Sequence, residues 1–267
     1  MSDTHFGKTE DEVIVSLIEA CVQCKPDLVV ISGDVTQLAR VKEFESARKF
    51  LESLRAKLLP MLIIPGNHDI RPLLSPIKRT LDPYDRYNNF IVPFSVPSFV
   101  DEEIAVHSIN TVRASRFKNG YVSKASMVKA QTWFDALPTN LIRIVVSHHP
   151  LDLPEEHPKR KLASHAEWGI YELAKSHIDI YLSGHYHRSG VVHTTQRYRK
   201  DHYAAVAIQA GTISNRMRGE LYSFNLLKIK RTTINITPYV WDVTHKDFVA
   251  TTSFDFVSRD NQWIPSQ

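Results

Sequence analysis

The stretch of sequence that decides the fold begins DLVVISGD (27–34) and ends MLIIPGNHD (61–69). Each of these two ends is a short apolar run that stops near a glycine followed by polar residues. Between them, residues 41–58 place apolar side chains at the spacing of a helix. A strand, a helix and a second strand joined by short turns predict a βαβ unit, in which the strands are parallel and the crossover is right-handed.

Similar segments extend this pattern in both directions. Upstream, residues 12–24 carry an apolar helical stripe, and Thr9 and Glu12 have the spacing of a capping box. Downstream, further helices are expected over residues 123–137 and 165–176. Apolar runs predict strands at 104–109, 141–146 and 178–182, followed by antiparallel strands at 203–208, 221–229, 231–241 and 248–257. The proline-rich residues 71–100 are expected to form a lid or surface excursion within a single α/β domain of residues 1–267.

The composition is that of an ordinary globular protein. The 267 residues are 43% hydrophobic and 23% charged, and 33 basic against 29 acidic residues give a net charge of +4. No apolar run reaches the roughly 18 residues of a membrane helix, and the polar start is unlike a secretory signal, so no membrane partner and a cytoplasmic location are expected. The mild basic excess suits an anionic substrate, whereas nucleic acid is not favoured because no basic stripe is present.

The two cysteines form a C-x-x-C pair, Cys21 and Cys24, which is a spacing used by redox and zinc sites. Both fall on the apolar stripe of the first predicted helix, and no further soft ligands lie nearby. We therefore expect both side chains to pack in the core.

Residue types that bind metals follow four of the predicted strands. They are Asp34, the run Asn67-His68-Asp69, the pair His148-His149, and His185 with His187; Asp3 and His5 stand at the start of the chain. Ligand sites in open α/β sheets form at the carboxyl ends of strands, so these clusters are expected to meet in one cleft. Each motif alone is common in turns and cores, but chance poorly explains all of them in this order. Carboxylate, imidazole and amide ligands without thiolate suit Mn, Fe, Zn or Ni, and two such ions suit in-line displacement at phosphorus.

The ordered motifs resemble the calcineurin-like metallophosphoesterase superfamily over residues 2 to about 190. These motifs are DxH (3–5), GD (33–34), GNHD (66–69), HHP (148–150) and GHxH (184–187). A later stretch with AGT (210–212), RGE (218–220) and YSFN (222–225) resembles the class III cyclic-nucleotide phosphodiesterase branch. The resemblance implies a four-layer α/β/β/α sandwich with two mixed β-sheets.

The resemblance also implies a role for each site residue. Two transition-metal ions, Mn, Fe or Zn, would be held by Asp3, His5 and His187 for the first, Asn67, His148 and His185 for the second, and Asp34 bridging both. His68 would stand over the phosphate and stabilise the transition state or protonate the leaving oxygen. Asp69 would either hold the other ring nitrogen of His68 or cap the following turn, and His149 would support or pack against the ligands. For Arg216 and Arg218, contact with substrate and a solvated loop both remain open.

The chain departs from the family pattern at its start. The family has an apolar strand before DxH, whereas only Met1 and Ser2 precede Asp3 here. We therefore expect a truncated first strand, with either a natural reading frame that begins upstream of Met1 or a destabilised chain that binds the first metal weakly.

The predicted function is a dinuclear metal-dependent phosphoesterase that hydrolyses phosphodiester bonds by in-line attack of a metal-bridging hydroxide. The expected substrate is a small phosphorylated molecule, with cyclic nucleotides as one candidate. The alternatives are a DNA-repair-type nuclease, a phosphomonoesterase and a non-catalytic scaffold of the same fold. The sequence predicts neither the oligomeric state nor the identity of the metals.

Overall fold

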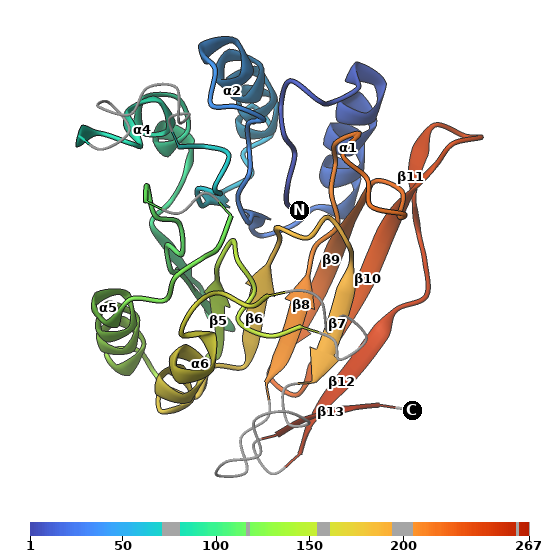
Figure 1. Ribbon diagram of the computed structural model, residues 1–267. Helices are drawn as coiled ribbons and strands as arrows, with labels where there is room; N and C mark the ends of the chain where they lie inside the picture. The colour runs from blue at the N-terminus through green and yellow to red at the C-terminus, as the bar shows by residue number, and fades with distance from the viewer. Residues whose placement is uncertain (71–80, 116–117, 154–160, 194–204, 260–261, 267) are drawn as a thin grey trace.

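The computed structural model contains the predicted βαβ unit (Figure 1). β1 (Val29–Ile31) and β2 (Met61–Ile63) pair in parallel, and α2 (Val41–Arg55) connects them. α2 buries one apolar face, on which Phe44 and Leu51 are fully buried. Its amino end is held because the carboxylate of Glu43 accepts hydrogen bonds from the backbone N–H groups of Leu38 and Arg40.

The structure describes residues 1–70, 81–115, 118–153, 161–193, 205–259 and 262–266. Besides α2, its helices are α1 (Asp11–Cys24), α4 (Asp85–Phe90), the short 3-10 helix η1 (Val92–Phe94), α5 (Lys124–Asp135) and α6 (Ala166–Ala174). Besides β1 and β2, its strands are β3 (Ser98–Val100), β4 (Ile104–Ser108), β5 (Ile142–Val146), β6 (Ile180–Ser183), β7 (Gly190–His193), β8 (Val206–Gln209), β9 (Ser223–Lys230), β10 (Thr233–Asp242), β11 (Asp247–Ala250), β12 (Phe254–Arg259) and β13 (Gln262–Pro265).

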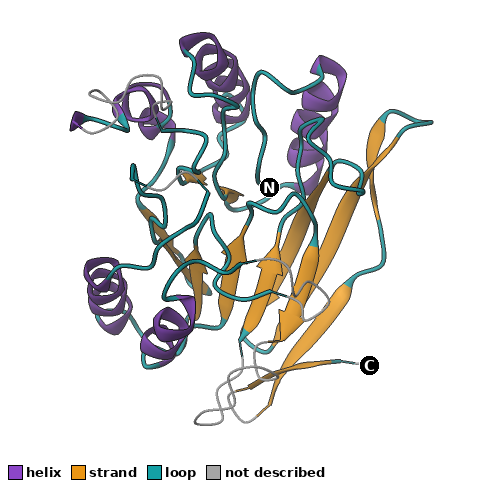
Figure 2. Cartoon of the chain, viewed as in Figure 1, coloured by secondary structure: helices purple, strands orange, loops and turns teal. Residues whose placement is uncertain are grey.

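The largest sheet is mixed, with its strands in the order β3-β4-β5-β6-β8-β7. β4, β5, β6 and β8 run parallel to one another, and the edge strands β3 and β7 run antiparallel to β4 and β8. The strand expected at 203–208 among the antiparallel strands is therefore β8, which pairs in parallel with β6. Figure 2 shows α5 and α6 together on one side of this sheet, while α1 and α2 lie across the molecule from them. The parallel strands all end at one edge, so the polar residues that follow β5 and β6 emerge together there.

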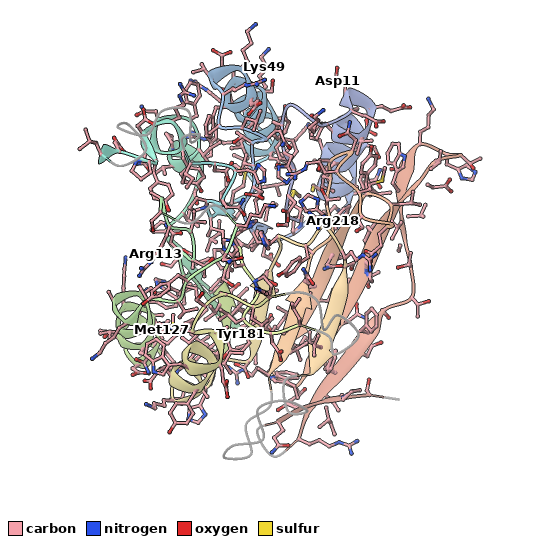
Figure 3. The ribbon with its side chains drawn as sticks, viewed as in Figure 1. Asp11, Lys49, Arg113, Met127, Tyr181 and Arg218 are labelled. Atoms are coloured by element: carbon pink, nitrogen blue, oxygen red, sulfur yellow. The ribbon has the colours of Figure 1, made fainter. Side chains whose placement is uncertain are left out.

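Alternate residues of the mixed sheet pack into different hydrophobic cores. Val106 and Ile144 belong to a core shared with the strands of the other sheets. Their neighbours Ala105 and Val145 belong to a core shared with α5 and α6, which includes Met127 of α5 (Figure 3). A third core joins α1 and α2 to β1 and β2. The combination of helices with a mixed sheet confirms the predicted α/β class.

The remaining strands divide into two sheets. β10 pairs with β9, β11 and β12, and β12 pairs with β13, all antiparallel. Among the described residues, β1 pairs only with β2, and β9 pairs only with β10. The strands therefore form three hydrogen-bonded sheets where two were expected, because no strand joins β1 to β9.

A cavity of about 440 Å³ lies between β1 and β9. Its walls include Cys21 of α1 on one side and Ile144, Leu182 and Ile208 of the mixed sheet on the other. Residues 1–6 contain no assigned strand, but they run beside the end of β1. The Met1 amine donates to the carbonyl of Val30, and a single parallel bridge joins residues 6 and 36.

Three local expectations need correction. The capping box expected from Thr9 and Glu12 is wrong, because Glu10 is the N-cap of α1 and no side chain caps the helix. The Glu10 carboxylate instead accepts a hydrogen bond of 2.6 Å from the Tyr222 hydroxyl. Cys21 is buried as expected, but Cys24 is only half-buried because it lies at the last turn of the helix. Of the expected surface excursion, residues 71–80 lie outside the described residues. The rest forms α4, η1 and β3, and the hydroxyl of buried Tyr87 donates to the β2 backbone, so this part belongs to the core.

Within the described part of the chain, none of the helices combines the length and the apolar character needed to cross a membrane.

Candidate metal centre

The polar residues at the strand ends come together at one edge of the sheets. Asp34 follows β1, Asn67 follows β2, His148 follows β5 and His185 follows β6. Two glycines allow the loops to approach this closely. A Cβ on Gly33 would lie 2.5 Å from the ring of His148, and one on Gly66 would lie 2.1 Å from Oδ1 of Asp34. The glycines of the GD and GNHD motifs are therefore required by packing.

Strained backbone is concentrated at this edge. Asp3, His5, Asp34, His185 and His187 all have left-handed φ values, of 52°, 42°, 51°, 76° and 57°. Such values are uncommon for residues other than glycine and cluster at functional sites, where the surrounding structure maintains them. The conformation turns each side chain toward a common point.

The first group of ligand atoms comes from Asp3, His5, Asp34 and His187, whose donor atoms all lie within 4.8 Å of one another. Nε2 of His5 lies 3.0 Å from Nε2 of His187, and Oδ1 of Asp3 lies 3.2 Å from Nε2 of His187. All four side chains are almost completely buried. A buried acid–imidazole cluster of this density matches the chemistry of a metal site.

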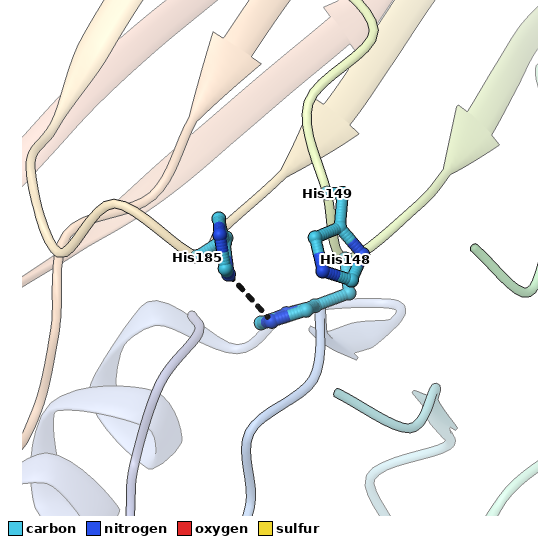
Figure 4. Close-up of side chains that lie close together, drawn as sticks. All are labelled: His148, His149 and His185. Atoms are coloured by element: carbon cyan, nitrogen blue, oxygen red, sulfur yellow. Dashed lines mark hydrogen bonds between the residues drawn. The ribbon is translucent and has the colours of Figure 1, made fainter. Parts of the chain in front are cut away.

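The second group lies beside the first. Ligand atoms of His148, His149 and His185 are within 4.8 Å of one another, and Figure 4 shows the three imidazoles meeting from two loops. Nδ1 of His185 lies 3.3 Å from Nε2 of His148, and Oδ1 of Asn67 lies 3.2 Å from the same Nε2. The structure thus places Asn67 where the sequence predicted it, and it adds His149 to the group by distance.

Asp34 stands between the two groups. Its Oδ2 atom lies 3.6 Å from Nε2 of His5 and 3.4 Å from Nε2 of His148. Its Oδ1 atom accepts a hydrogen bond of 2.8 Å from the backbone N–H of His68. One oxygen is therefore committed to fixing the side chain, and the other faces both groups.

Backbone carbonyls orient three of the imidazoles. Nδ1 of His5, His148 and His187 lies 3.2, 2.9 and 2.8 Å from the carbonyls of residues 36, 32 and 216. A carbonyl only accepts, so these partners require the proton on Nδ1 and leave the Nε2 lone pair toward the group. Oδ1 of Asp3 is buried in the same place with no hydrogen-bond donor. Imidazole nitrogens and carboxylate oxygens that converge in a buried place fit a cation, so the residues present suit the metal ions that the motifs imply.

Burial and charge shift the pKa values of the site in opposite directions. Burial alone would raise the pKa values of Asp3 and Asp34, but the neighbouring imidazoles hold both well below the usual range. Burial disfavours charge on His148 too, yet Asp34 raises its pKa to about 9. Burial and the His148 charge lower the pKa of His185 to about 3. A cation that binds here displaces a proton from His148, so its affinity should fall as the pH falls.

His68 lies at the side of the first group. Its ring meets the ring of His5 edge-on, with centroids 4.8 Å apart. Nδ1 lies 2.6 Å from the carbonyl of Gln37, and Nε2 lies 3.1 Å from Nη1 of Arg216. Burial lowers the pKa of His68 below its ordinary value of 6.5.

Asp69 has neither of its expected partners. Its carboxylate accepts hydrogen bonds from the backbone N–H groups of Val35, Thr36 and Gly66, at 3.0, 2.7 and 2.9 Å. The nitrogen of His68 that it was expected to hold contacts Gln37 instead. Asp69 joins the loop after β1 to the loop after β2, because buried backbone donors there need an acceptor.

Two other contributors belong to no motif. The Thr111 hydroxyl lies 2.9 Å from Nδ1 of His149, and the carbonyl of Gln37 holds His68. Thr111 follows β4 and Gln37 follows β1. A position just after a strand was therefore the sequence signal that could have pointed to these two residues. His107 belongs to no metal-binding motif and is buried against Trp133, and His157 and His202 lie outside the described residues.

Comparisons with known proteins give the family. Residues 1–189 match the family described as calcineurin-like phosphoesterase. The chain is 34% identical over 95 residues to the glycerophosphodiester phosphodiesterase GpdQ of Enterobacter lignolyticus (strain SCF1), covering 31% of this chain and 33% of that protein. It is 27% identical over 172 residues to the probable glycerophosphodiester phosphodiesterase GpdQ of Arcobacter nitrofigilis, covering 59% of this chain and 58% of that protein. The matched regions thus span at most about three fifths of these curated relatives.

Solved structures share the fold at low identity. The purple acid phosphatase PPD1 from yellow lupin aligns with a TM-score of 0.66 and 12% identity, covering 95% of this chain and 52% of that chain. A dimetal phosphatase from Danio rerio aligns with a TM-score of 0.60 and 11% identity, covering 94% and 97%. Because the matching family pattern extends over more than half of its length, the chain belongs to the calcineurin-like phosphoesterase family.

Proposed function

We propose that this chain is a metal-dependent phosphoric ester hydrolase that cleaves small phosphodiesters at a site for two metal ions. The observation that carries the proposal is the position of Asp34 Oδ2, within 3.6 Å of His5 Nε2 and 3.4 Å of His148 Nε2. A single carboxylate oxygen facing two separate groups of lone pairs is the arrangement that a bridging ligand needs. Ordinary ion pairs would not require a shared carboxylate oxygen, because a separate carboxylate could pair with each imidazole.

The ligand assignment follows from this position. Asp3, His5 and His187 would hold one ion, Asn67, His148 and His185 the other, and Asp34 would be shared. Mn, Fe or Zn suits this mixture of imidazole, carboxylate and amide. Bound there, two ions would polarise a phosphate group and lower the pKa of a water molecule. His149 is kept as a supporting residue because the resemblance assigns His148, the first histidine of the pair, as the ligand; the Nδ1 atom of His149 contacts Thr111.

His68 would act on the substrate without binding metal. The Gln37 carbonyl fixes the proton on Nδ1, so Nε2 is the atom available to a phosphate oxygen. The half-buried imidazole lies at the margin of the first group, with its ring centroid 4.8 Å from that of His5. With a second proton on Nε2, the imidazolium form of His68 would donate to, or protonate, the leaving oxygen.

The names of the curated relatives support a small diester as substrate, because both are glycerophosphodiester phosphodiesterases. A cyclic nucleotide is the diester expected from the sequence resemblance, and it remains within the same proposal. A single folding domain and a cytoplasmic location also remain predictions.

Metal loading and substrate profiling test the proposal together. Purified protein would be stripped with a chelator, reloaded with Mn²⁺, Fe²⁺ or Zn²⁺, and assayed by elemental analysis. Hydrolysis would then be followed with bis(p-nitrophenyl) phosphate, a glycerophosphodiester, a 3′,5′-cyclic nucleotide, p-nitrophenyl phosphate and DNA. We expect two ions per chain, activity that the chelator abolishes and metal restores, and faster cleavage of small diesters than of the monoester. Full loading with no hydrolysis would indicate a scaffold, a preferred monoester a phosphomonoesterase, and DNA cleavage a nuclease.

A further inference from the structure

Arg216 brings a guanidinium group to the margin of the first group. Its Nη1 atom lies 3.1 Å from Nε2 of His68 and 3.3 Å from Nε2 of His5. Arg216 comes from the loop between β8 and β9, far from both histidines in the sequence. The residue is half-buried, so the guanidinium has left most of the bulk solvent while still being reachable from it.

The loop that carries Arg216 is anchored around it. The carbonyl of Arg216 accepts from Nδ1 of His187, and the adjacent Asn215 N–H donates to the carbonyl of Lys8. On the other side, Nε of Arg188 donates to the carbonyl of Arg218. The backbone therefore sets where the guanidinium lies, and a substitution of the side chain leaves these contacts in place.

The guanidinium has no anionic partner in the part of the chain that the structure describes. Among the described residues, the polar side-chain atoms it contacts are imidazole nitrogens, and no ion pair joins it to a carboxylate. A half-buried cation without a counter-charge is costly, and a planar guanidinium binds the oxygens of a phosphate through two parallel hydrogen bonds. The group is thus ready for an anionic ligand at a place where only imidazoles now contact it.

We propose that Arg216 is a substrate-binding residue that grips the non-bridging oxygens of the phosphate group undergoing hydrolysis. The proposal rests on the proposed function for the reaction itself, and the anion site rests on the geometry of Arg216 alone. A phosphate oxygen that takes the Nη1 donor would leave Nε2 of His68 facing the same phosphate. Arg216 would therefore select for a charged phosphoryl group and orient it toward His68.

Arg218 offers a matched control. It lies in the same loop, is exposed, and contributes a backbone carbonyl to the contact with Arg188 (Figure 3). Arg216→Met and Arg218→Met each remove one positive charge from this loop, so they differ in position and not in net charge. Arg216→Lys keeps the charge but loses the planar fork.

The experiment measures binding of inorganic phosphate to Mn²⁺-loaded protein by calorimetry, and kcat and KM for bis(p-nitrophenyl) phosphate. For Arg216→Met we expect phosphate affinity to fall about 10- to 100-fold, the usual worth of a charge-assisted hydrogen bond, with KM rising by a similar factor. Arg216→Lys should recover part of the loss, and Arg218→Met should match the unsubstituted protein. Metal content should be equal in all four proteins.

The outcomes separate this inference from the proposed function. Unchanged phosphate affinity and KM in Arg216→Met, or an equal loss in Arg218→Met, would overturn the role of Arg216 while leaving the hydrolase intact. Phosphate binding that depends on Arg216 in a protein that hydrolyses no ester would support the anion site and reject the reaction. A protein that binds no phosphate at all would overturn the assignment of Arg216.

Discussion

The carboxylate of Asp34 is the side chain on which the two groups of ligand atoms depend. Because its Oδ2 atom faces both His5 and His148, Asp34→Asn should weaken both ions and not only one. We expect metal content and hydrolysis to fall together, by more than tenfold in activity. Elemental analysis after gel filtration checks this. Two tightly bound ions in the variant would contradict a bridging role.

His68 is expected to affect turnover and leave the metals in place. Its Nδ1 atom is committed to the carbonyl of Gln37 and its Nε2 atom contacts Nη1 of Arg216, so His68→Ala should retain full metal content. The variant should lose about 10²–10⁴-fold in turnover, the usual contribution of one general acid or base. The loss should shrink for substrates with good leaving groups. Reduced metal content in His68→Ala would instead make His68 a ligand.

His107 should make the folded protein sensitive to acid. Its ring stacks on Trp133 with centroids 4.8 Å apart, and burial, with Lys129 nearby, lowers its pKa to about 4. An unfolded histidine titrates near 6.5, so below this pH the unfolded state binds a proton that the folded state does not. This contribution to stability is therefore present above about pH 6.5 and is lost as the pH falls toward 4.

The variant His107→Phe keeps the stacked ring but does not titrate. We expect its unfolding free energy to improve relative to the unsubstituted protein by about 1 kcal/mol between pH 7 and pH 5, allowing for partial solvent screening. Urea unfolding at both pH values measures this, and the titration of the site histidines cancels in the comparison. A difference that is the same at both pH values would show that His107 does not titrate abnormally.

Among the structural elements, the loops after β1 and β2 are joined through Asp69. Its carboxylate accepts three backbone N–H bonds of 2.7–3.0 Å, and the loops carry Asp34 and Asn67. In Asp69→Asn the amide can accept at only one oxygen and turns its NH₂ toward N–H donors. We expect a loss of about 2–3 kcal/mol in unfolding free energy and reduced metal content, although Asp69 is no ligand. Asp11→Asn on exposed α1 is the control for charge, and equal behaviour of the two variants would contradict the prediction.

For the molecule as a whole, the cavity between β1 and β9 is expected to limit stability. The backbone groups of Val29 and Ile31 form hydrogen bonds on the β2 side, so those of Val30 point to the cavity side. There the carbonyl of Val30 accepts a hydrogen bond from the Met1 amine. One extended segment placed there would pair with both free strand edges and join two sheets into one.

A fusion experiment tests the expected first strand. About six alternating Val and Ile residues attached ahead of Met1 would bury side chains against α1 on one face and the mixed sheet on the other. We expect the thermal midpoint to rise by about 5 °C or more and the first ion to bind more tightly. A fusion of equal length with alternating prolines, which lack N–H donors, should give no gain. Equal midpoints for both fusions and the unextended chain would show that this cavity does not limit stability.

The sequence by itself determined most of the central elements and the polar residues that follow them. The periodic spacing of apolar residues and the turn residues that interrupt it are local signals, each spanning only a few positions. They were therefore enough to predict, to within a few residues, the βαβ unit, α5, α6 and the strands before His148 and His185. The ordered motifs also named the residues that meet at the sheet edge. Missed elements such as α4 and β3 lie in a proline-rich stretch where the local signals conflict.

Only the tertiary structure decided which atoms face one another. His5 and His187 are 182 positions apart, yet their Nε2 atoms lie 3.0 Å from each other, and no local pattern encodes that distance. The same holds for Asp69, whose partners are backbone N–H groups of two loops, and for Arg216, which reaches His68 across 148 positions. Hydrogen-bond partners depend on where separate loops finally lie, and that is set by the packing of the sheets and helices beneath them.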